Sequence, residues 1–295
     1  DLYHQVFNMK NNILIFSTLL LIISCDIEER PYIADYDSYV NPEKKVLIED
    51  YTGHLCPNCP EAGREIKAIQ DIYGNQVIAL AIHVSKTFAR PYPESQAPKF
   101  QYDFRTQWGD NWDETFSISN LGLPRGMVNR LSYPSNHQLG KDQWAGIVAE
   151  ELRKEIDFKI SITSDNSNIY INTEVVNTLL NKHNIFICLA ENNVINWQKD
   201  GQEEVENYEH NHILRSVIAD ESISNSYELA SGQIIEKEYS YDISSLEQVN
   251  IDYSNSIELG NGNSGGWNVN NMTVIAFIYN TENKEIVQVE EAILN

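Results

Sequence analysis

Two cysteines, Cys56 and Cys59, lie two residues apart in the stretch YTGHLCPNCP, which runs from residue 51 to residue 60. A pair at this spacing can work as a thiol–disulfide couple, supply half of a metal site, or form a short structural bridge. The 295-residue chain contains four cysteines. The surroundings of the other two, Cys25 and Cys188, therefore decide how many partners the pair can have.

The residues around the pair predict a β-strand followed by a helix that begins at the cysteines. KVLIEDY, at 45–51, has the pattern of a strand, and CPNCPEAGREIKAIQDIYG has helical spacing up to Gly74. Free backbone N–H groups and the positive end of the dipole at a helix start stabilise a thiolate. We therefore expect Cys56 to be the outer, attacking thiol and Cys59 the more buried, resolving thiol. His54 is expected to add positive charge, to shuttle a proton, or simply to be an exposed loop histidine.

A metal site would need two ligands besides the two cysteines, and the sequence has no second CxxC motif. Cys188 lies in NIFICLAE, an apolar segment in which a free cysteine behaves as a small hydrophobic residue. His210 and His212 would share one face of a strand, but two histidines alone indicate packing or hydrogen bonding. We therefore expect no metal.

A purely structural bridge between Cys56 and Cys59 is the remaining alternative. The chain-entropy model gives about 2 kcal/mol for so short a loop, against about 3 kcal/mol for a loop of 15 residues. Such a bridge adds little to a chain that can build a hydrophobic core. Reversible chemistry or inherited geometry is favoured, and the redox-active and structural interpretations both stay open.

The segment MKNNILIFSTLLLIISC, from Met9 to Cys25, has one lysine, an apolar stretch and a small residue before its cysteine. This pattern is typical of a secretory signal peptide and is too short for a transmembrane helix. The cysteine after Ile-Ile-Ser resembles the lipobox of bacterial lipoproteins, which implies a signal peptide at 9–24, a lipidated Cys25, and residues 1–8 upstream of the true start. Several acyl chains such as palmitate would anchor the protein stably to a membrane. The mature protein is thus expected outside the cytoplasm, where disulfides persist.

Changes in pattern divide the rest of the chain into three parts. Residues 25–44 are acidic and lack a clear period, as expected of a tether. Residues 45–156 alternate strands with helices around an aromatic-rich insertion at 86–115, and predict an α/β domain. From 157 to 295, alternating or apolar segments separated by Asn, Ser, Asp and Gly predict an all-β sandwich.

The charge balance excludes nucleic acid as a partner. The chain carries 43 acidic and 21 basic side chains, for a formal net charge of −22. Nucleic acid binding needs basic patches, and the acidic residues are scattered as on an ordinary solvated surface. The glycine-rich GNGNSGG lacks the helix and the lysine of a phosphate-binding loop, so we expect no cofactor.

The segment VLIEDYTGHLCPNCPEAGREI resembles the active-site segment of the thioredoxin-like fold. The resemblance implies that Asp50, six residues before Cys56, is a buried acid that serves proton transfer. It also implies that Pro124, in LGLPRGMVNR, is the cis-proline of that fold on a loop facing the cysteines. Leu55 replaces the aromatic residue usual before the first cysteine, and Pro60 is unusual for the redox enzymes. The direction of electron flow is therefore open.

The chain is more closely similar to the Omp-twenty-eight-related outer-membrane lipoproteins of Bacteroidota. The similarity lies in the lipoprotein signal and in four further stretches: EDYTGHLCPNCP, LPRGMVNR, HNHILRSVI and NMTVIAFIYNTENKEIVQVEEAIL. It implies an α/β thioredoxin-like domain followed by an all-β immunoglobulin-like sandwich domain. It also implies a lipid-anchored protein of the outer membrane, on its periplasmic face or at the cell surface.

Two functions follow from these features. In the first, a thiol–disulfide oxidoreductase acts on envelope proteins: Cys56 attacks, Cys59 resolves, Asp50 assists proton transfer and Pro124 shapes the substrate groove. In the second, a binding or adhesion lipoprotein contacts an envelope or extracellular protein, or a glycan, through its β-domain or its aromatic stretch at 90–112. The sequence slightly favours the second function, with a CxxC pair that retains possible thiol–disulfide activity.

Overall fold

Residues 40–165 and 167–295 are described by the computed structural model of the chain. The expected signal peptide at 9–24, the lipidation of Cys25 and most of the tether lie outside the described residues, so they stay predictions.

The first part of the chain folds as the expected strand–helix–strand unit. Strand β1 (Val46–Thr52) and strand β2 (Val77–His83) pair in parallel over their whole lengths, and helix α2 (Cys59–Tyr73) connects them. Both strands are covered on both faces, and β2 is accordingly a nearly continuous apolar run, whereas β1 also contains the buried polar residues Glu49 and Asp50. The helix packs on the sheet through one buried stripe that contains Ala62, Ile66 and Ile69.

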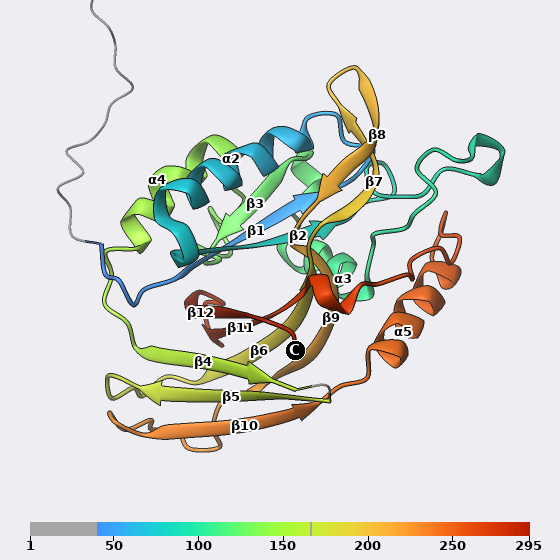
Figure 1. Ribbon diagram of the computed structural model, residues 1–295. Coiled ribbons are helices and arrows are strands. Elements are labelled where there is room, and N and C mark those ends of the chain that lie inside the picture. The colour runs from blue at the N-terminus through green and yellow to red at the C-terminus, as the bar shows by residue number, and fades with distance from the viewer. Residues whose placement is uncertain (1–39, 166) are drawn as a thin grey trace, which may run out of the picture. The chain divides into compact units, whose positions relative to one another are not determined.

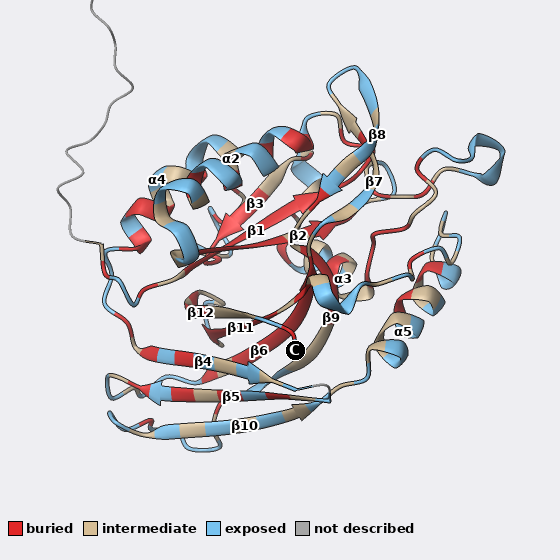
Figure 2. Ribbon diagram, viewed as in Figure 1, coloured by how far each residue is buried: buried red, intermediate tan, exposed pale blue. Residues whose placement is uncertain are grey.

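A third strand completes this part of the sheet. Strand β3 (Arg125–Val128) pairs antiparallel with β1, and the Leu123–Pro124 peptide before it is cis. Helix α4 (Trp144–Glu151) lies beside α2 on one face of the sheet, and helix α3 (Gln107–Phe116) lies on the other (Figure 1). Both faces of β1, β2 and β3 are therefore buried (Figure 2).

The second part is rich in strands, but the expectation that it is all-β is wrong, because helix α5 (Ile243–Ser256) lies between β10 and β11. Its strands are β4 (Phe158–Ser164), β5 (Asn168–Val175), β6 (His183–Glu191), β7 (Val194–Asp200), β8 (Glu203–His210), β9 (Ile213–Ser222), β10 (Ile234–Ser240), β11 (Met272–Asn280) and β12 (Ile286–Ile293).

One large sheet runs through both parts, in the strand order β12-β11-β6-β9-β2-β1-β3. The junction is the parallel contact of β2 with β9, where Ala81 pairs with Ile213. The expected boundary between residues 156 and 157 falls in the coil between α4 and β4, and the sheet crosses it. Residues 40–295 form one compact unit. The fold is thus mixed α/β around a large sheet.

A second, smaller sheet supplies the sandwich-like layer. The sheet β10-β5-β4 packs against the β6–β11 region of the large sheet through a shared apolar core. Phe158, Ile169 and Ile171 from the small sheet meet Ile185 and Ile187 from β6 in that core. The β7–β8 hairpin stands apart from both sheets and rises toward the start of α2 (Figure 1).

Candidate functional site

Cys56 and Cys59 form a disulfide at the start of α2. The predicted pairing of these two cysteines is confirmed. Both residues are buried, however: Cys56 is 1% exposed and Cys59 is 3% exposed. Cys56, expected to be the outer thiol, is therefore as inaccessible as its partner, and both belong to a core that also contains the free Cys188.

The β7–β8 hairpin covers the loop that carries the disulfide. The backbone N–H of Lys199 donates to the carbonyl oxygen of His54 over 2.8 Å, and the N–H of Gly201 donates to that of Pro57 over 2.8 Å. Two main-chain bonds thus flank Cys56 along the loop. They pair the loop with the tip of the hairpin almost as a short strand pair would.

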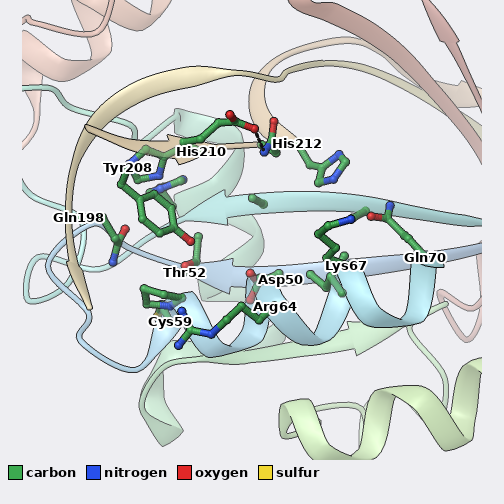
Figure 3. Close-up of a pocket in the computed structure, with 18 residues that line it drawn as sticks. Asp50, Thr52, Cys59, Arg64, Lys67, Gln70, Gln198, Tyr208, His210 and His212 are labelled. Carbon is green, nitrogen blue, oxygen red and sulfur yellow. Dashed lines mark hydrogen bonds between the residues drawn. The ribbon is translucent and has the colours of Figure 1, made fainter. Parts of the chain in front are cut away.

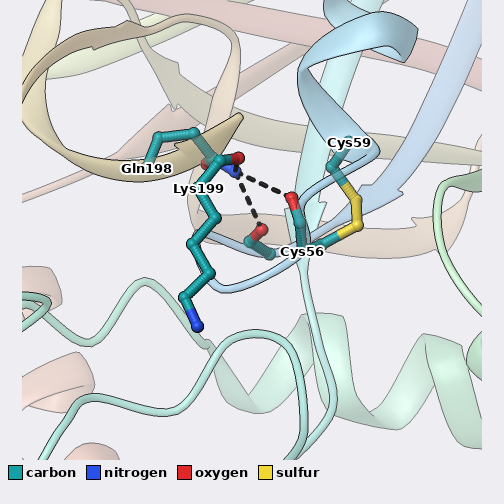
Figure 4. The surroundings of a disulfide bond; sticks show 5 residues. Cys56, Cys59, Gln198 and Lys199 are labelled. Atoms are coloured by element: carbon teal, nitrogen blue, oxygen red, sulfur yellow. Dashed lines mark hydrogen bonds between the residues drawn. A yellow bond between two sulfur atoms is a disulfide. The ribbon is translucent and has the colours of Figure 1, made fainter. Parts of the chain in front are cut away.

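The Gln198 side chain adds further hydrogen bonds between the hairpin and the disulfide loop. Its amide Nε2 donates to the carbonyl oxygen of Cys56 over 3.1 Å and lies 3.4 Å from that of Gly53 (Figure 4). Gln198 is itself buried. The same amide also donates to the carbonyl oxygen of Lys199 over 2.8 Å. Gln198 therefore ties the disulfide loop to the backbone of the hairpin through one buried side chain.

The aromatic-rich insertion covers the disulfide loop from another side. The N–H of Leu55 donates to the carbonyl oxygen of Phe88 over 2.8 Å, and the His54 ring lies 2.8 Å from the Arg90 carbonyl oxygen. Phe100 and Phe104 pack against the His54 ring, with centroid distances of 5.6 and 5.7 Å. These aromatic side chains belong to the interior, so they do not form an exposed binding surface.

Burial decides the charge of His54. Its side chain is fully buried, and burial lowers its pKa to about 4 although the contact with the Arg90 carbonyl opposes that shift. His54 is therefore neutral near pH 7. Neither sequence-based interpretation of this residue, as a source of positive charge or as an exposed loop histidine, agrees with this position.

Asp50 lies on β1, near the end of the strand that leads into the disulfide loop. Its carboxyl is buried, and Oδ1 has no hydrogen-bond partner among the described residues. Burial raises the pKa of Asp50 to about 7. The buried position agrees with the resemblance to thioredoxins, and the proton-transfer role of Asp50 stays a prediction.

The raised pKa predicts how Asp50 changes stability with pH. Between about pH 4 and pH 7 the unfolded chain releases this proton while the folded protein keeps it, so the group's contribution falls by up to about 1.4 kcal/mol per pH unit. Replacement of Asp50 by asparagine removes this loss. The unfolding free energy of the variant relative to wild type should therefore rise by about 2–3 kcal/mol from pH 5 to pH 8, measured by urea denaturation. A difference that does not change with pH would contradict the buried, protonated carboxyl.

Pro124 lies close to the end of β1 that leads into the cysteines. Arg125 opens β3 and pairs with Tyr51 of β1, so Pro124 comes next to the last residues of that strand. The cis peptide at Leu123–Pro124 agrees with the expectation from the resemblance. A role of Pro124 in a substrate groove stays a prediction.

A cavity of about 430 Å³ opens beside the disulfide, between α2, β2 and the end of β8 (Figure 3). Its walls come from separate elements: Asp50 from β1, Cys59 and Lys67 from α2, His83 from β2, and His210 from β8. The cavity therefore joins parts of the chain that lie up to about 160 residues apart in sequence, and one of the two cysteines lines it.

Sequence reasoning did not connect Gln198, Tyr208 or His83 with the site. His83 gave a signal, because it interrupts the apolar run VIALAIHV. Gln198 and Tyr208 gave no such signal, because the stretches QKD and ENYEH that contain them are polar. His210 and His212 line the same cavity, and His210 hydrogen bonds to the backbone of Trp197 as a packed histidine does.

In residues 40–165 and 167–295, no three His, Cys, Asp or Glu side chains come together as metal ligands would. None of the helices in this part of the chain is both long and apolar enough to cross a bilayer.

Comparison with known proteins gives a family match and a fold match. Residues 109–295 match the family model described as Outer membrane protein Omp28, a span that includes Pro124 and the hairpin. No curated protein matches the chain.

Among solved structures, HBP35 of Porphyromonas gingivalis is similar over 85% of this chain and 76% of its own, with 14% identity and a TM-score of 0.55. The protein AGR_C_4864 from Agrobacterium tumefaciens is similar over 85% of this chain and 95% of its own, with 12% identity and a TM-score of 0.50. A domain of the outer membrane lipoprotein Omp28 from Porphyromonas gingivalis matches 48% of this chain and 91% of its own, with 14% identity and a TM-score of 0.26. The first two likenesses show a shared fold alone.

Proposed function

Because the chain belongs to the Omp28 family of outer membrane proteins, we propose that it is a lipid-anchored binding protein of the outer membrane with a structural Cys56–Cys59 disulfide. The lipid is placed on Cys25, at the end of the lipoprotein-type signal. In this proposal residues 45–156 are a thioredoxin-like unit and residues 157–295 are an immunoglobulin-like unit. The large sheet fuses the two.

The burial of Cys56 carries this proposal. An exchange reaction needs a thiolate that approaches one sulfur of a disulfide, and access decides its rate. Here the hairpin bonds of Lys199 and Gly201 and the loop bond of Phe88 hold backbone over the loop that carries Cys56. The surface that a protein substrate would need is therefore occupied by the chain itself.

Two observations favour the alternative, a thiol–disulfide oxidoreductase acting on envelope proteins. A buried acid with a raised pKa, Asp50, lies near Cys59, and the cis-peptide Pro124 adjoins the same end of β1. This chemistry would require the hairpin or the insertion to move away from Cys56 before each exchange.

The two functions predict different labelling of the cysteines. The native full chain is incubated with dithiothreitol, alkylated, and analysed by mass spectrometry for each cysteine. Cys188 serves as an internal reporter, because it is buried in the same core and burial raises its thiol pKa, so that it labels only when the core opens. We expect Cys56 and Cys59 to be alkylated only together with Cys188, and insulin to stay unreduced.

Alkylation of Cys56 and Cys59 while Cys188 stays protected would show local opening of the disulfide loop. Together with reduction of insulin, it would replace the structural interpretation by the oxidoreductase. The same protein after urea denaturation is the positive control, in which Cys56, Cys59 and Cys188 should all label after reduction.

A further inference from the structure

Three buried histidines surround one phenylalanine beneath the segments that cover the disulfide. The ring of Phe104 stacks on that of His83 with a centroid distance of 4.6 Å. The centroids of the His210 and His54 rings lie 4.8 and 5.7 Å from that of Phe104. Phe104 belongs to the insertion, His83 to β2, His210 to β8 and His54 to the disulfide loop. The cluster therefore lies where the insertion and the hairpin meet the sheet and the loop.

The closed cluster accommodates neutral imidazoles. Nδ1 of His54, Nδ1 of His83 and Nε2 of His210 are buried and lack a hydrogen-bond partner among the described residues. The three side chains are at most 5% exposed. A protonated imidazole donates from both ring nitrogens, so each ring would bury a charged N–H that reaches neither an acceptor nor water.

Burial makes the cluster sensitive to acid. It lowers the pKa of His54 to about 4, that of His210 to about 3, and that of His83 well below its usual value. In water each imidazole would regain a pKa of about 6.5. The contribution of the cluster to closure is therefore fully present above about pH 6.5, and it is lost as the pH falls below that value.

The charged groups nearest the cluster do not compensate for the lost hydration. Arg215 lowers the pKa of His83 and His210 further, and Arg105 and Lys199 lower that of His54. Asp103 acts on His54 in the opposite direction, but it is ion-paired with Arg105 over 2.8 Å. Arg215 is likewise paired with a carboxylate, that of Glu191, over 2.7 Å. The charges around the cluster thus disfavour a further positive charge.

Other titratable groups face the cluster from the cavity beside α2, which Asp50, Glu209 and His212 line together with His83 and His210. Burial lowers the pKa of His212 to about 4, so this residue has the same sign as the cluster. Burial raises the pKa of Asp50 to about 7, so Asp50 favours the buried state at low pH and can only reduce the response. Glu209 is exposed and hydrogen bonds to Asn211. Burial raises the pKa of Tyr208, whose ring centroid lies 4.9 Å from that of His210, and the phenol stays neutral.

We propose that this cluster is an acid-sensitive latch: protonation of His54, His83 and His210 releases the hairpin and the insertion from the disulfide loop. Each ring lies at a contact between these covering segments and the rest of the fold, so lifting the segments brings all three to water. The same movement breaks the bonds of Lys199 and Gly201 to the loop. The inference goes beyond the proposed function, and it holds whether the disulfide is structural or reactive.

Hydrogen exchange of the full chain at pH 7.5 and pH 5.5, followed by mass spectrometry, tests the latch. Each measured rate is divided by the intrinsic rate at the same pH, which gives a protection factor. The amides of Lys199 and Gly201 report the cover, and those of β6 report the core. One histidine with these pKa values shifts the opening equilibrium about tenfold between the two pH values. The protection of the two cover amides should therefore fall at least about tenfold at pH 5.5, while that of β6 is kept.

Replacement of His83 by leucine removes one titrating ring and its unpaired nitrogen. The fall in protection between pH 7.5 and pH 5.5 should become about tenfold smaller than in wild type. His137→Leu is the matched control, because His137 is also buried with an unpaired Nδ1 but packs against Phe116 and Tyr133, outside the cluster. It should keep the wild-type response. If His83→Leu does not fold, His210→Leu takes its place, and if neither folds the wild-type profile decides.

Three results would overturn the latch. The cover amides could be equally protected at both pH values, or β6 could lose protection together with them, as in global acid unfolding. A folded His83→Leu or His210→Leu variant could also keep the full response of His137→Leu. The cysteine labelling at neutral pH tests the proposed function separately, because the latch is closed there.

Discussion

Replacement of Arg130 by methionine is expected to lower the free energy of unfolding by about 3–5 kcal/mol, because the change leaves the charge of Glu49 unpaired in the core. The two side chains form a bidentate pair: Nε of Arg130 donates to Oε2 of Glu49 over 2.8 Å, and the second donor reaches Oε1 over 2.7 Å. The Arg130 side chain is 5% exposed and that of Glu49 is fully buried. Water therefore cannot replace the lost partner.

Arg130 also joins the two parts of the chain. Its guanidinium lies between aromatic rings at 4.9 to 5.8 Å from their centroids, those of Phe116, Phe277, Trp112 and Tyr279. Two of these rings come from α3 and two from β11. The main chain next to it makes a similar link, since the carbonyl oxygen of Asn129 accepts a bond from Ile286 of β12. Urea denaturation of the variant should therefore still show one transition, at lower urea.

A matched charge removal at the surface is the control for Arg130. Lys67 forms an exposed pair with Asp71 four residues on, so replacement of Lys67 by methionine should cost about 0.5 kcal/mol or less. The double variant Glu49→Gln with Arg130→Met should recover part of the loss, because it leaves no unpaired charge. A loss below about 1 kcal/mol, or two separate transitions, would contradict a shared core.

The local elements of the fold were predictable because local patterns encode them. The apolar run of β2 marks a strand covered on both faces, and the buried stripe of α2 has helical spacing. In β4 and β5 apolar and polar residues alternate, as in a strand with one buried face. The Cys56–Cys59 pair is visible in a short motif, while the buried position of Asp50 and the cis peptide at Pro124 were expected from the resemblance of two short segments to the thioredoxin-like fold. These predictions need no knowledge of what packs against the motif.

The covering of the site was not predictable in this way. The hairpin strand β8 reads EEVENYEH, a largely exposed segment in which every second residue on average is glutamate and which lacks an apolar face. Lys199 of the neighbouring strand β7 and Gly201 of the turn after it bond to the disulfide loop through their main-chain N–H groups. Main-chain groups are the same for nearly every residue type. The single-residue junction of Ala81 with Ile213 likewise leaves no pattern that could separate one shared sheet from two domains.

Gly53 shows how closely the insertion is pressed onto the disulfide loop. A Cβ atom placed at Gly53 would lie 2.3 Å from the carbonyl oxygen of Phe88, far inside contact distance, and the obstacle is backbone that cannot rotate away. The same Phe88 oxygen accepts the bond from Leu55. A side chain at Gly53 must therefore push the insertion off the loop that leads to Cys56.

Replacement of Gly53 by alanine should consequently open the site without touching either cysteine. We expect the free energy that holds the insertion against the disulfide loop to fall by about 1–3 kcal/mol. Dithiothreitol should therefore reduce the disulfide about 5- to 150-fold faster than in wild type. The rate is measured by quenching with iodoacetamide and quantifying alkylated Cys56 and Cys59 by mass spectrometry, with Cys188 protected throughout.

Gly63→Ala is the matched control, since its Cβ would meet only the Tyr208 hydroxyl oxygen at 3.7 Å, an ordinary contact, and alanine favours the helix. Its reduction rate should equal that of wild type. An unchanged rate in Gly53→Ala would show that the insertion does not limit access to the disulfide. Reduction of insulin by Gly53→Ala but not by wild type would show that the Cys56–Cys59 pair can still exchange disulfides. The covering segments, rather than Leu55 or Pro60 beside the cysteines, would then be what prevents exchange in wild type.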